Sequence, residues 1–164
     1  MRRWFQIALW LAVGGLVLLA VRQLLPNDEK RIRKTLLELA DKASAPGSGR
    51  ALDHLAAAAE VAAFFAPQFE INVETTGVDL AISERAELIQ TVVSARSQPR
   101  SARIEILDIV VNVGTDNKVA TAELTARVAI SGERDSIVAE LRFEMIKLER
   151  RWLIRRIETM RTFQ

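Results

Sequence analysis

Apolar and polar residues alternate along most of the chain from Ser101 to Thr162. Successive side chains of a β-strand point to opposite faces, so a period of two predicts strands with one covered face. Turn-forming residues interrupt this alternation at 114–118 and 132–135, and a tight link lies near Arg150. The pattern therefore predicts four long strands, over 101–113, 119–131, 136–149 and 151–162.

One face of this predicted sheet is apolar and the other carries charges of both signs. In the second and third long strands the apolar positions are Ala120, Ala122, Leu124, Ala126, Val128, Ile130, Ile137, Ala139, Leu141, Phe143 and Met145. In the first strand the alternation slips at Ile106 and Leu107, which predicts a β-bulge that bends the sheet.

Helical spacing of apolar residues dominates the chain between residues 28 and 100. A first helix is predicted from Asp28 to the loop 44–49, because Ile32, Leu36, Leu39, Ala40 and Ala43 share one side. A second helix is predicted over 50–66, with an inward side formed by Leu52, Leu55, Ala59, Ala62 and Phe65.

Two short strands and a third helix complete this region. Pro67 should end the second helix, and alternation predicts strands over 69–74 and 78–82, joined by a turn at Thr76 and Gly77. Ser83 is a good N-cap for the third helix, which Gln98 and Pro99 close. Its predicted inward residues are Leu88, Ile89, Val92 and Ala95.

The N-terminal segment has a different character. Residues 4–21 form a run of 18 without a charge, which as a helix would be about 27 Å long, enough for a hydrocarbon core. We predict a single transmembrane helix that includes Trp4, Leu9, Gly14, Leu18 and Val21, with 1–27 as anchor and 28–164 as the folded domain. The exit of the segment lacks a small-x-small cleavage site, so we interpret it as an uncleaved signal anchor.

The orientation of this anchor depends on which charges are counted. Arg2 and Arg3 before the apolar run resemble the head of an export signal, which places the domain on the periplasmic side of the inner membrane. Arg22 and the cations that follow it favour the opposite orientation. We adopt export as the prediction and keep the inward orientation as the alternative.

Composition excludes several classes of function. The 164 residues contain no Cys, one His and no Tyr, which removes thiol chemistry, His-rich metal sites and phenol acids. The net charge is +2, but Arg2, Arg3 and Arg22 precede residue 28, so the rest carries 20 basic and 21 acidic residues. A near-neutral domain lacks the surplus of cations that nucleic-acid binding requires, and we predict no nucleic-acid partner, no metal and no cofactor.

The order of these elements resembles that of the nuclear transport factor 2-like superfamily, including its SnoaL-like members. The resemblance covers about residues 28–164. It rests on the turn and helix at Gly77–Ser83 with SERAELIQTVVSAR, and on Trp152 and Ile154 in the closing RWLIRRIE strand. It implies an α+β, cystatin-like cone: helices packed on a curved, mixed and mostly antiparallel sheet that leaves a pocket. Members of the superfamily include isomerases, cyclases, dehydratases and non-catalytic modules, and many dimerise through the exposed sheet.

Few residues qualify as site candidates. His54 is the one side chain whose ordinary pKa lies near neutrality, and it lies beside Asp53 at the polar edge of an Ala-rich helix, which favours a surface or satisfied histidine. Asp108 and Asn112 could enter a pocket but are interpreted as facing water. The line Glu70, Asn72 and Glu74 is interpreted as a solvated face, and the cations Arg150, Arg151, Arg155, Arg156 and Arg161 as cross-strand partners of Glu140 and Glu144.

These observations predict a membrane-anchored, non-catalytic binding or assembly module that could hold a small apolar pocket. Val119, Val138 and Ile146 on the polar face of the sheet indicate a homodimer, and an envelope protein is a second expected partner. One alternative is a small-molecule isomerase- or hydrolase-like enzyme that uses His54 or a buried carboxylate. The other is an inward-facing membrane adaptor that docks through the arginine-rich last strand.

Overall fold

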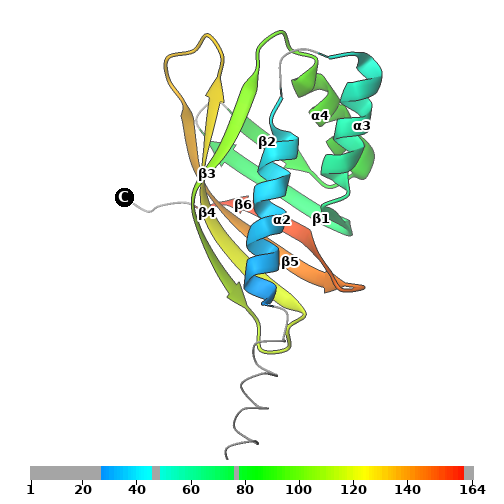
Figure 1. Cartoon of the computed structure of the whole chain (residues 1–164), viewed down its shortest axis with the longest axis vertical. Coiled ribbons are helices and arrows are strands. Elements are labelled where there is room, and N and C mark those ends of the chain that lie inside the picture. The colour runs from blue at the N-terminus through cyan, green and yellow to red at the C-terminus, as the bar shows by residue number, and fades with distance from the viewer. Residues whose placement is uncertain (1–26, 46–48, 76–77, 161–164) are drawn as a thin grey trace, which may run out of the picture.

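The computed structural model describes residues 27–45, 49–75 and 78–160, which form three helices and six strands (Figure 1). The helices are α2 (Asp28–Ala43), α3 (Ala51–Ala62) and α4 (Arg85–Arg96). The strands are β1 (Phe65–Thr75), β2 (Val78–Ile82), β3 (Ala102–Val113), β4 (Val119–Ile130), β5 (Ile137–Leu148) and β6 (Arg151–Thr159). The four long strands and the helix from Asp28 are thus confirmed to within a few residues.

The predicted membrane span, with Trp4, Leu9, Gly14, Leu18 and Val21, lies outside the described residues. Within the part of the chain that the structure describes, no helix combines the length and the apolar character that a membrane crossing needs.

The six strands form one mixed sheet in the order β2-β1-β6-β5-β4-β3. All neighbours are antiparallel except β1 and β6, which run parallel. The predicted bulge is confirmed: the register of β3 against β4 shifts between Ile106 and Asp108. A second shift, between Glu144 and Met145, lies where β5 meets β6. Such bulges increase the bend of a sheet, and the sheet curves around α2.

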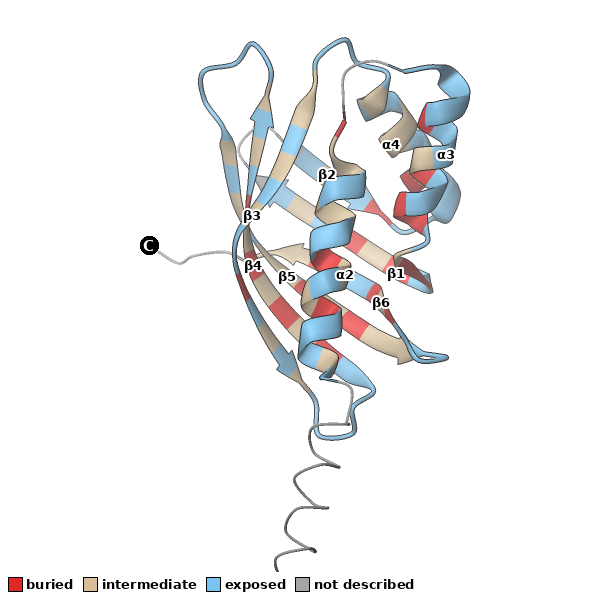
Figure 2. Ribbon diagram, in the orientation of Figure 1, coloured by how far each residue is buried: buried red, intermediate tan, exposed pale blue. Residues whose placement is uncertain are grey.

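All three helices lie on the same face of the sheet, where the core is buried (Figure 2). Ile32 and Leu36 of α2 and Met145 and Ile154 of the sheet belong to one core cluster, and all four are almost completely buried. Burial of an aliphatic side chain of this size contributes about 1.5–3 kcal/mol relative to exposure. The apolar stripe of α2 and the apolar face of the sheet therefore hold the fold together, as their patterns predict.

Polar contacts fix both ends of α2. At its start, Asn27 accepts a hydrogen bond from the Lys30 amide at 3.2 Å, which caps the helix. At its end, Arg96 of α4 donates to the carbonyl oxygens of Lys42 and Ser44 at 2.9 and 2.7 Å. Because the last carbonyls of a helix have no partner within it, this arginine satisfies the end of α2 from another element.

The second helix differs from its prediction. α3 ends at Ala62 instead of residue 66, because Phe65 already lies in β1 and pairs with Ile154 of the parallel strand β6. The side of α3 that is buried also differs from the predicted one. Leu52 and Leu55 are 78% and 51% exposed, and Ala59 is exposed as well. The buried residues of the helix are His54, Ala58, Val61 and Ala62. The alanine side lies inward because small side chains allow the close approach of α3 to its neighbours.

The start of α4 is a further correction. Ser83 is not the N-cap; that position belongs to Glu84, which makes no side-chain capping bond. Instead, Arg85 donates hydrogen bonds to the carbonyl oxygens of Ala62, Phe65 and Ala66 and so joins α4 to the link between α3 and β1. Along α4, Leu88 is buried and Ile89 and Val92 are half-buried as predicted, whereas Ala95 is exposed.

Candidate functional site

The concave side of the fold lies between the helices and the sheet, where a site enclosed by the fold would lie (Figure 1). Aliphatic and aromatic side chains fill it, among them Phe65, Phe69, Leu124, Phe143 and Trp152. Among the described residues, His54 is the only buried side chain that is polar or charged. No pair of an acid and a base therefore meets in this described interior.

His54 lies at the edge of this interior, on α3, and is only 8% exposed. Its Nδ1 is 3.2 Å from the hydroxyl of Ser97, at the end of α4. That hydroxyl already donates its proton to the carbonyl oxygen of Val93 at 2.8 Å. The Ser97 oxygen can therefore accept from Nδ1–H of His54, and in the neutral tautomer that carries its proton on Nδ1 the other ring nitrogen, Nε2, is an acceptor.

The Nε2 of His54 has no hydrogen-bond partner among the described residues although it is buried. A Cβ atom at Gly49 would lie 2.6 Å from it, so the Gly49 backbone covers this nitrogen closely. The prediction of a surface or satisfied histidine is wrong, since the side chain is buried and only one of its ring nitrogens is paired. Alternation and helical spacing could not reveal this, because Ser97 and Gly49 lie on other elements.

The opposite, outer face of the sheet carries no helix among the described residues, and it is where Asp108 and Asn112 lie, both exposed. Asp108 pairs in register with Thr125, and Asn112 with Thr121. The structure therefore places these two candidates on the solvent side of the sheet and far from His54, which lies in the helical layer.

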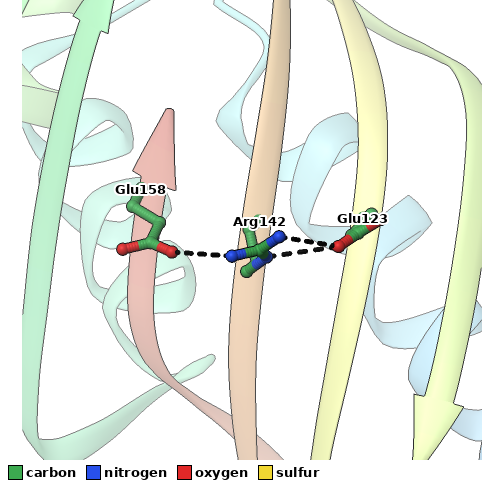
Figure 3. A network of polar contacts seen from close by, with 3 residues as sticks. All are labelled: Glu123, Arg142 and Glu158. Carbon is green, nitrogen blue, oxygen red and sulfur yellow. Dashed lines mark hydrogen bonds and ion pairs between the residues drawn. The ribbon is translucent and has the colours of Figure 1, made fainter. Parts of the chain in front are cut away.

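A charge network crosses the middle of this outer face (Figure 3). Arg142 of β5 donates to Glu123 of β4 at 3.0 Å and to Glu158 of β6 at 3.5 Å. The three residues are direct cross-strand neighbours in register. Each pair is about half exposed, so each contributes little to stability, about 0.2–1 kcal/mol. Their effect is to align the strands and to satisfy the charges of this face internally.

The arginine-rich last strand divides into two groups that the sequence does not separate. Arg155 and Arg156 face the outer side and bind Glu144 and Glu70, each at 2.9 Å. The predicted pairing with Glu144 is confirmed. Arg150 lies instead in the turn between β5 and β6, Arg151 is the first residue of β6, and Arg161 lies outside the described residues.

The acidic line on β1 is part of the same outer face. Glu70 accepts from Asn72 at 2.7 Å as well as from Arg156, and the Glu74 amide donates to the hydroxyl of Thr159. Among the residues that the structure describes, no group of three or more potential metal-ligating side chains is assembled.

A short apolar row lies beside the charge network. Val119, Ile146 and Leu153 are successive neighbours across β4, β5 and β6, and all three lie on the outer face. Val119 is 39% exposed, and Ile146 and Leu153 are half-buried. Sequence patterning identified the first two members but not Leu153, whose place in the row depends on the register of β6. Val138, 53% exposed, lies apart from this row, opposite Arg127.

In sequence, no family model matches the chain and no curated relative is found. In structure it is similar to a nuclear transport factor 2-like protein with a cystatin-like fold from Novosphingobium aromaticivorans, with a TM-score of 0.62 and 19% identity over 86% of both chains. A nuclear transport factor 2-like protein of unknown function from Pseudomonas putida matches with a TM-score of 0.62 and 9% identity, over 84% of this chain and 88% of that one.

A protein described as a putative scytalone dehydratase, also from Novosphingobium aromaticivorans, matches with a TM-score of 0.58 and 14% identity. The match covers 83% of this chain and 85% of that protein. Similarity at this level of identity establishes the fold, and the cystatin-like α+β architecture predicted from the order of elements is confirmed.

Proposed function

We propose that this protein is a membrane-anchored, non-catalytic assembly module that pairs with a second copy through the outer face of its sheet. The observation that carries the proposal is the row Val119, Ile146 and Leu153, which places apolar side chains on a face that no described helix covers. Apolar side chains gathered on an open face favour association, because their burial removes apolar area from water.

The charges of the outer face favour a second copy of the chain as the partner. Arginines and glutamates alternate across the strands, as in Glu123, Arg142 and Glu158. A two-fold interface brings the same surface of both copies together, so any charges in it must complement one another, which both signs on one face allow. The outer face meets this condition, because a copy rotated by half a turn can oppose its arginines to the glutamates of the first.

The anchor is the second part of the proposal, and it rests on the apolar run 4–21. This run ends a few residues before Asp28, where the folded domain begins with α2. We place the domain on the periplasmic side of the inner membrane, with an envelope protein as a further partner, because Arg2 and Arg3 precede the run.

The mass of the full chain in a mild detergent, measured by light scattering with the detergent contribution subtracted, tests the pairing. We expect a dimer for the wild type and a monomer for Val119→Glu, which places an extra charge in the apolar row. Leu52→Glu is the matched control, because Leu52 is 78% exposed on α3. A monomeric wild type, or a dimer that Val119→Glu does not change, would contradict pairing through this face.

An isomerase- or hydrolase-like enzyme is the second candidate, and one observation favours it. The Nε2 of His54 is an acceptor without a described partner, as a general base requires, and one structural neighbour is described as a putative dehydratase. A substrate would need to displace the Gly49 backbone to reach this nitrogen. An activity that is lost in His54→Gln, with the fold retained, would establish this alternative in place of the module.

A further inference from the structure

A cationic recess lies between α2 and the hairpin that joins β5 to β6. It has a volume of about 330 Å³, and four of its lining residues are Arg31 and Lys34 of α2 with Arg150 and Arg151 of the hairpin. We propose that this recess binds a phosphate group. Only the source of the phosphate depends on the anchored module proposed above; the binding of a phosphate group does not.

The charges of the recess are available to a ligand. Among the described residues, neither Arg31 nor Arg150 makes an ion pair within 4.0 Å, although the charge of Arg31 acts on the carboxylate of Asp28, and Arg151 makes only a long contact of 3.5 Å with the carbonyl oxygen of Ala63. Lys34 lies 3.6 Å from Glu38, the one carboxylate of the lining, and both side chains are more than half exposed. This differs from Arg155 and Arg156, whose charges are paired at 2.9 Å on the outer face.

Part of the lining of the recess is apolar. Phe64 and the buried Trp152 line it on the inner side of the sheet, and Thr35, which carries a hydroxyl, lines it as well. Asp28 holds the start of α2 against the hairpin, because its carboxylate accepts from both Trp152 and Lys147. This contact ties the start of α2, which carries Arg31 and Lys34, to the hairpin, which carries Arg150 and Arg151. Guanidinium groups that line one recess suit the oxygens of phosphate, which they bind through charge-assisted hydrogen bonds.

The backbone conformation of Arg150 supports a binding role for its side chain, in addition to the place of this residue in the turn. Arg150 has a φ of 71° and Glu149 a φ of 46°, the left-handed region that glycine and asparagine adopt at least cost. An arginine at such a position is unfavourable for the turn alone. Residues held in this region cluster at binding sites, where a side chain is needed at that point.

Two sources could supply the phosphate: a free phosphate compound, or the headgroup of an anionic lipid. The second follows if residues 4–21 lie in the bilayer, because Arg31 is only ten residues beyond Val21. Anionic headgroups attract cations close to the membrane surface and lose this attraction over about one Debye length.

Trp152 offers a reporter for the test, because it lines the recess. The full chain with Trp4→Phe and Trp10→Phe keeps Trp152 as its one tryptophan. In neutral detergent, its fluorescence is followed during titration with inorganic phosphate and with short-chain phosphatidylglycerol, and short-chain phosphatidylcholine provides the zwitterionic comparison. We expect a saturable change with phosphate or with phosphatidylglycerol. If phosphatidylglycerol reaches half-saturation at a much lower concentration than inorganic phosphate, the natural ligand is a lipid headgroup. If inorganic phosphate reaches half-saturation at the same or a lower concentration, the natural ligand is a free phosphate compound.

Four variants distinguish specific binding from a general effect of charge. Arg31→Glu should weaken binding on the order of tenfold or more, because a charge-assisted hydrogen bond is replaced by repulsion. Arg134→Glu, an exposed loop residue with the same change of charge, is the matched control and should leave the affinity within about twofold at moderate salt. Glu38→Gln should tighten binding, because it removes the carboxylate that competes for Lys34. Arg150→Gly should weaken binding while leaving the midpoint of thermal unfolding unchanged or higher.

No saturable response to either probe overturns the proposal, and so does an equal loss in Arg31→Glu and Arg134→Glu. Because the probes are presented in detergent solution, the result does not depend on dimerisation or on insertion into a bilayer. A failure here therefore leaves the proposed module untouched, and a monomeric chain leaves the phosphate site untouched.

Discussion

The carboxylate of Asp28 accepts a hydrogen bond from the indole Nε1 of Trp152 at 3.0 Å, although 124 residues separate them in the chain. Its other oxygen lies 2.7 Å from the ammonium group of Lys147, which also lies 5.5 Å from the centre of the Trp152 ring. Asp28 is the first residue of α2, and Trp152 and Lys147 flank the hairpin of β5 and β6. This contact fixes the point at which the folded domain meets the N-terminal segment, and it shapes one side of the cationic recess.

Removal of the Asp28 carboxylate should destabilise the fold. Asp28→Ala leaves the Lys147 ammonium and the Trp152 N–H without their partner, and we expect a loss of about 2–4 kcal/mol in the free energy of unfolding. Asp28→Asn, which keeps one acceptor, should cost less. Urea unfolding of the full chain in detergent measures both. Glu29→Ala is the control: its carboxylate is half exposed, and we expect a change below about 0.5 kcal/mol.

The same carboxylate predicts a dependence of stability on pH. Burial of Asp28 by itself would raise its pKa, but the hydrogen bonds from Lys147 and Trp152 and the positive charges of Lys147 and Arg31 outweigh it and lower the pKa below its ordinary value of 3.8. The unfolded chain therefore binds the proton more readily than the folded one. The contribution of Asp28 is complete above about pH 5 and is lost as the pH falls through 3.8 to the folded pKa.

The difference in unfolding free energy between the wild type and Asp28→Asn isolates this contribution from the other carboxylates. We expect it to be constant from about pH 5 to 7 and to shrink below this range. A difference that grew on acidification would show that the pKa of Asp28 is raised in the folded protein.

Gly49→Ala should disturb the histidine. The new methyl carbon would lie 2.6 Å from Nε2 of His54, closer than such contacts occur, so the imidazole or the backbone at residue 49 must shift, which disturbs the contact of Nδ1 with Ser97. We expect a loss of about 1–3 kcal/mol, as for other overpacked positions. The double variant with His54→Ala removes the clash, so the Gly49→Ala substitution should cost much less in that background. Equal costs in both backgrounds would locate the strain in the backbone instead.

Arg85 should be irreplaceable by lysine. Its guanidinium spans three carbonyl oxygens of the link between α3 and β1, and a lysine ammonium lacks this planar fork. Arg85→Lys should cost about 1–2 kcal/mol, and Arg85→Met somewhat more, because carbonyl groups at a helix end lose their donors. Arg103→Lys, on the exposed side of β3, should be neutral in the same thermal unfolding measurement.

The orientation of the domain can be determined directly. A reporter that is active only outside the cytoplasm, fused after Gln164, should be active in a bacterial membrane if the head formed by Arg2 and Arg3 directs export. A chain that resists carbonate extraction but carries a silent reporter would place the domain in the cytoplasm. It would also favour the inward-facing adaptor over the periplasmic module.

Much of the architecture follows from local patterns in the sequence. The four long strands, the bulge after Ile106 and the helix from Asp28 were all predictable, because a period of two or of 3.6 residues is written into adjacent positions. The covered face of the sheet followed from the same alternation, since hydrophobic burial selects one set of side chains and excludes the other. The order of these elements was enough to indicate the cystatin-like fold.

The tertiary structure alone decided the features that depend on partners far along the chain. The parallel pairing of β1 with β6 determined where α3 ends, and close helix packing brought its alanine side inward instead of Leu52. The packing of the sheet separated Arg156, paired with Glu70 on the outer face, from Arg150, which lines the recess together with Arg31. Periodicity predicts which side of a helix or strand is apolar. It does not predict which other element that side packs against, because this depends on the packing of the whole chain.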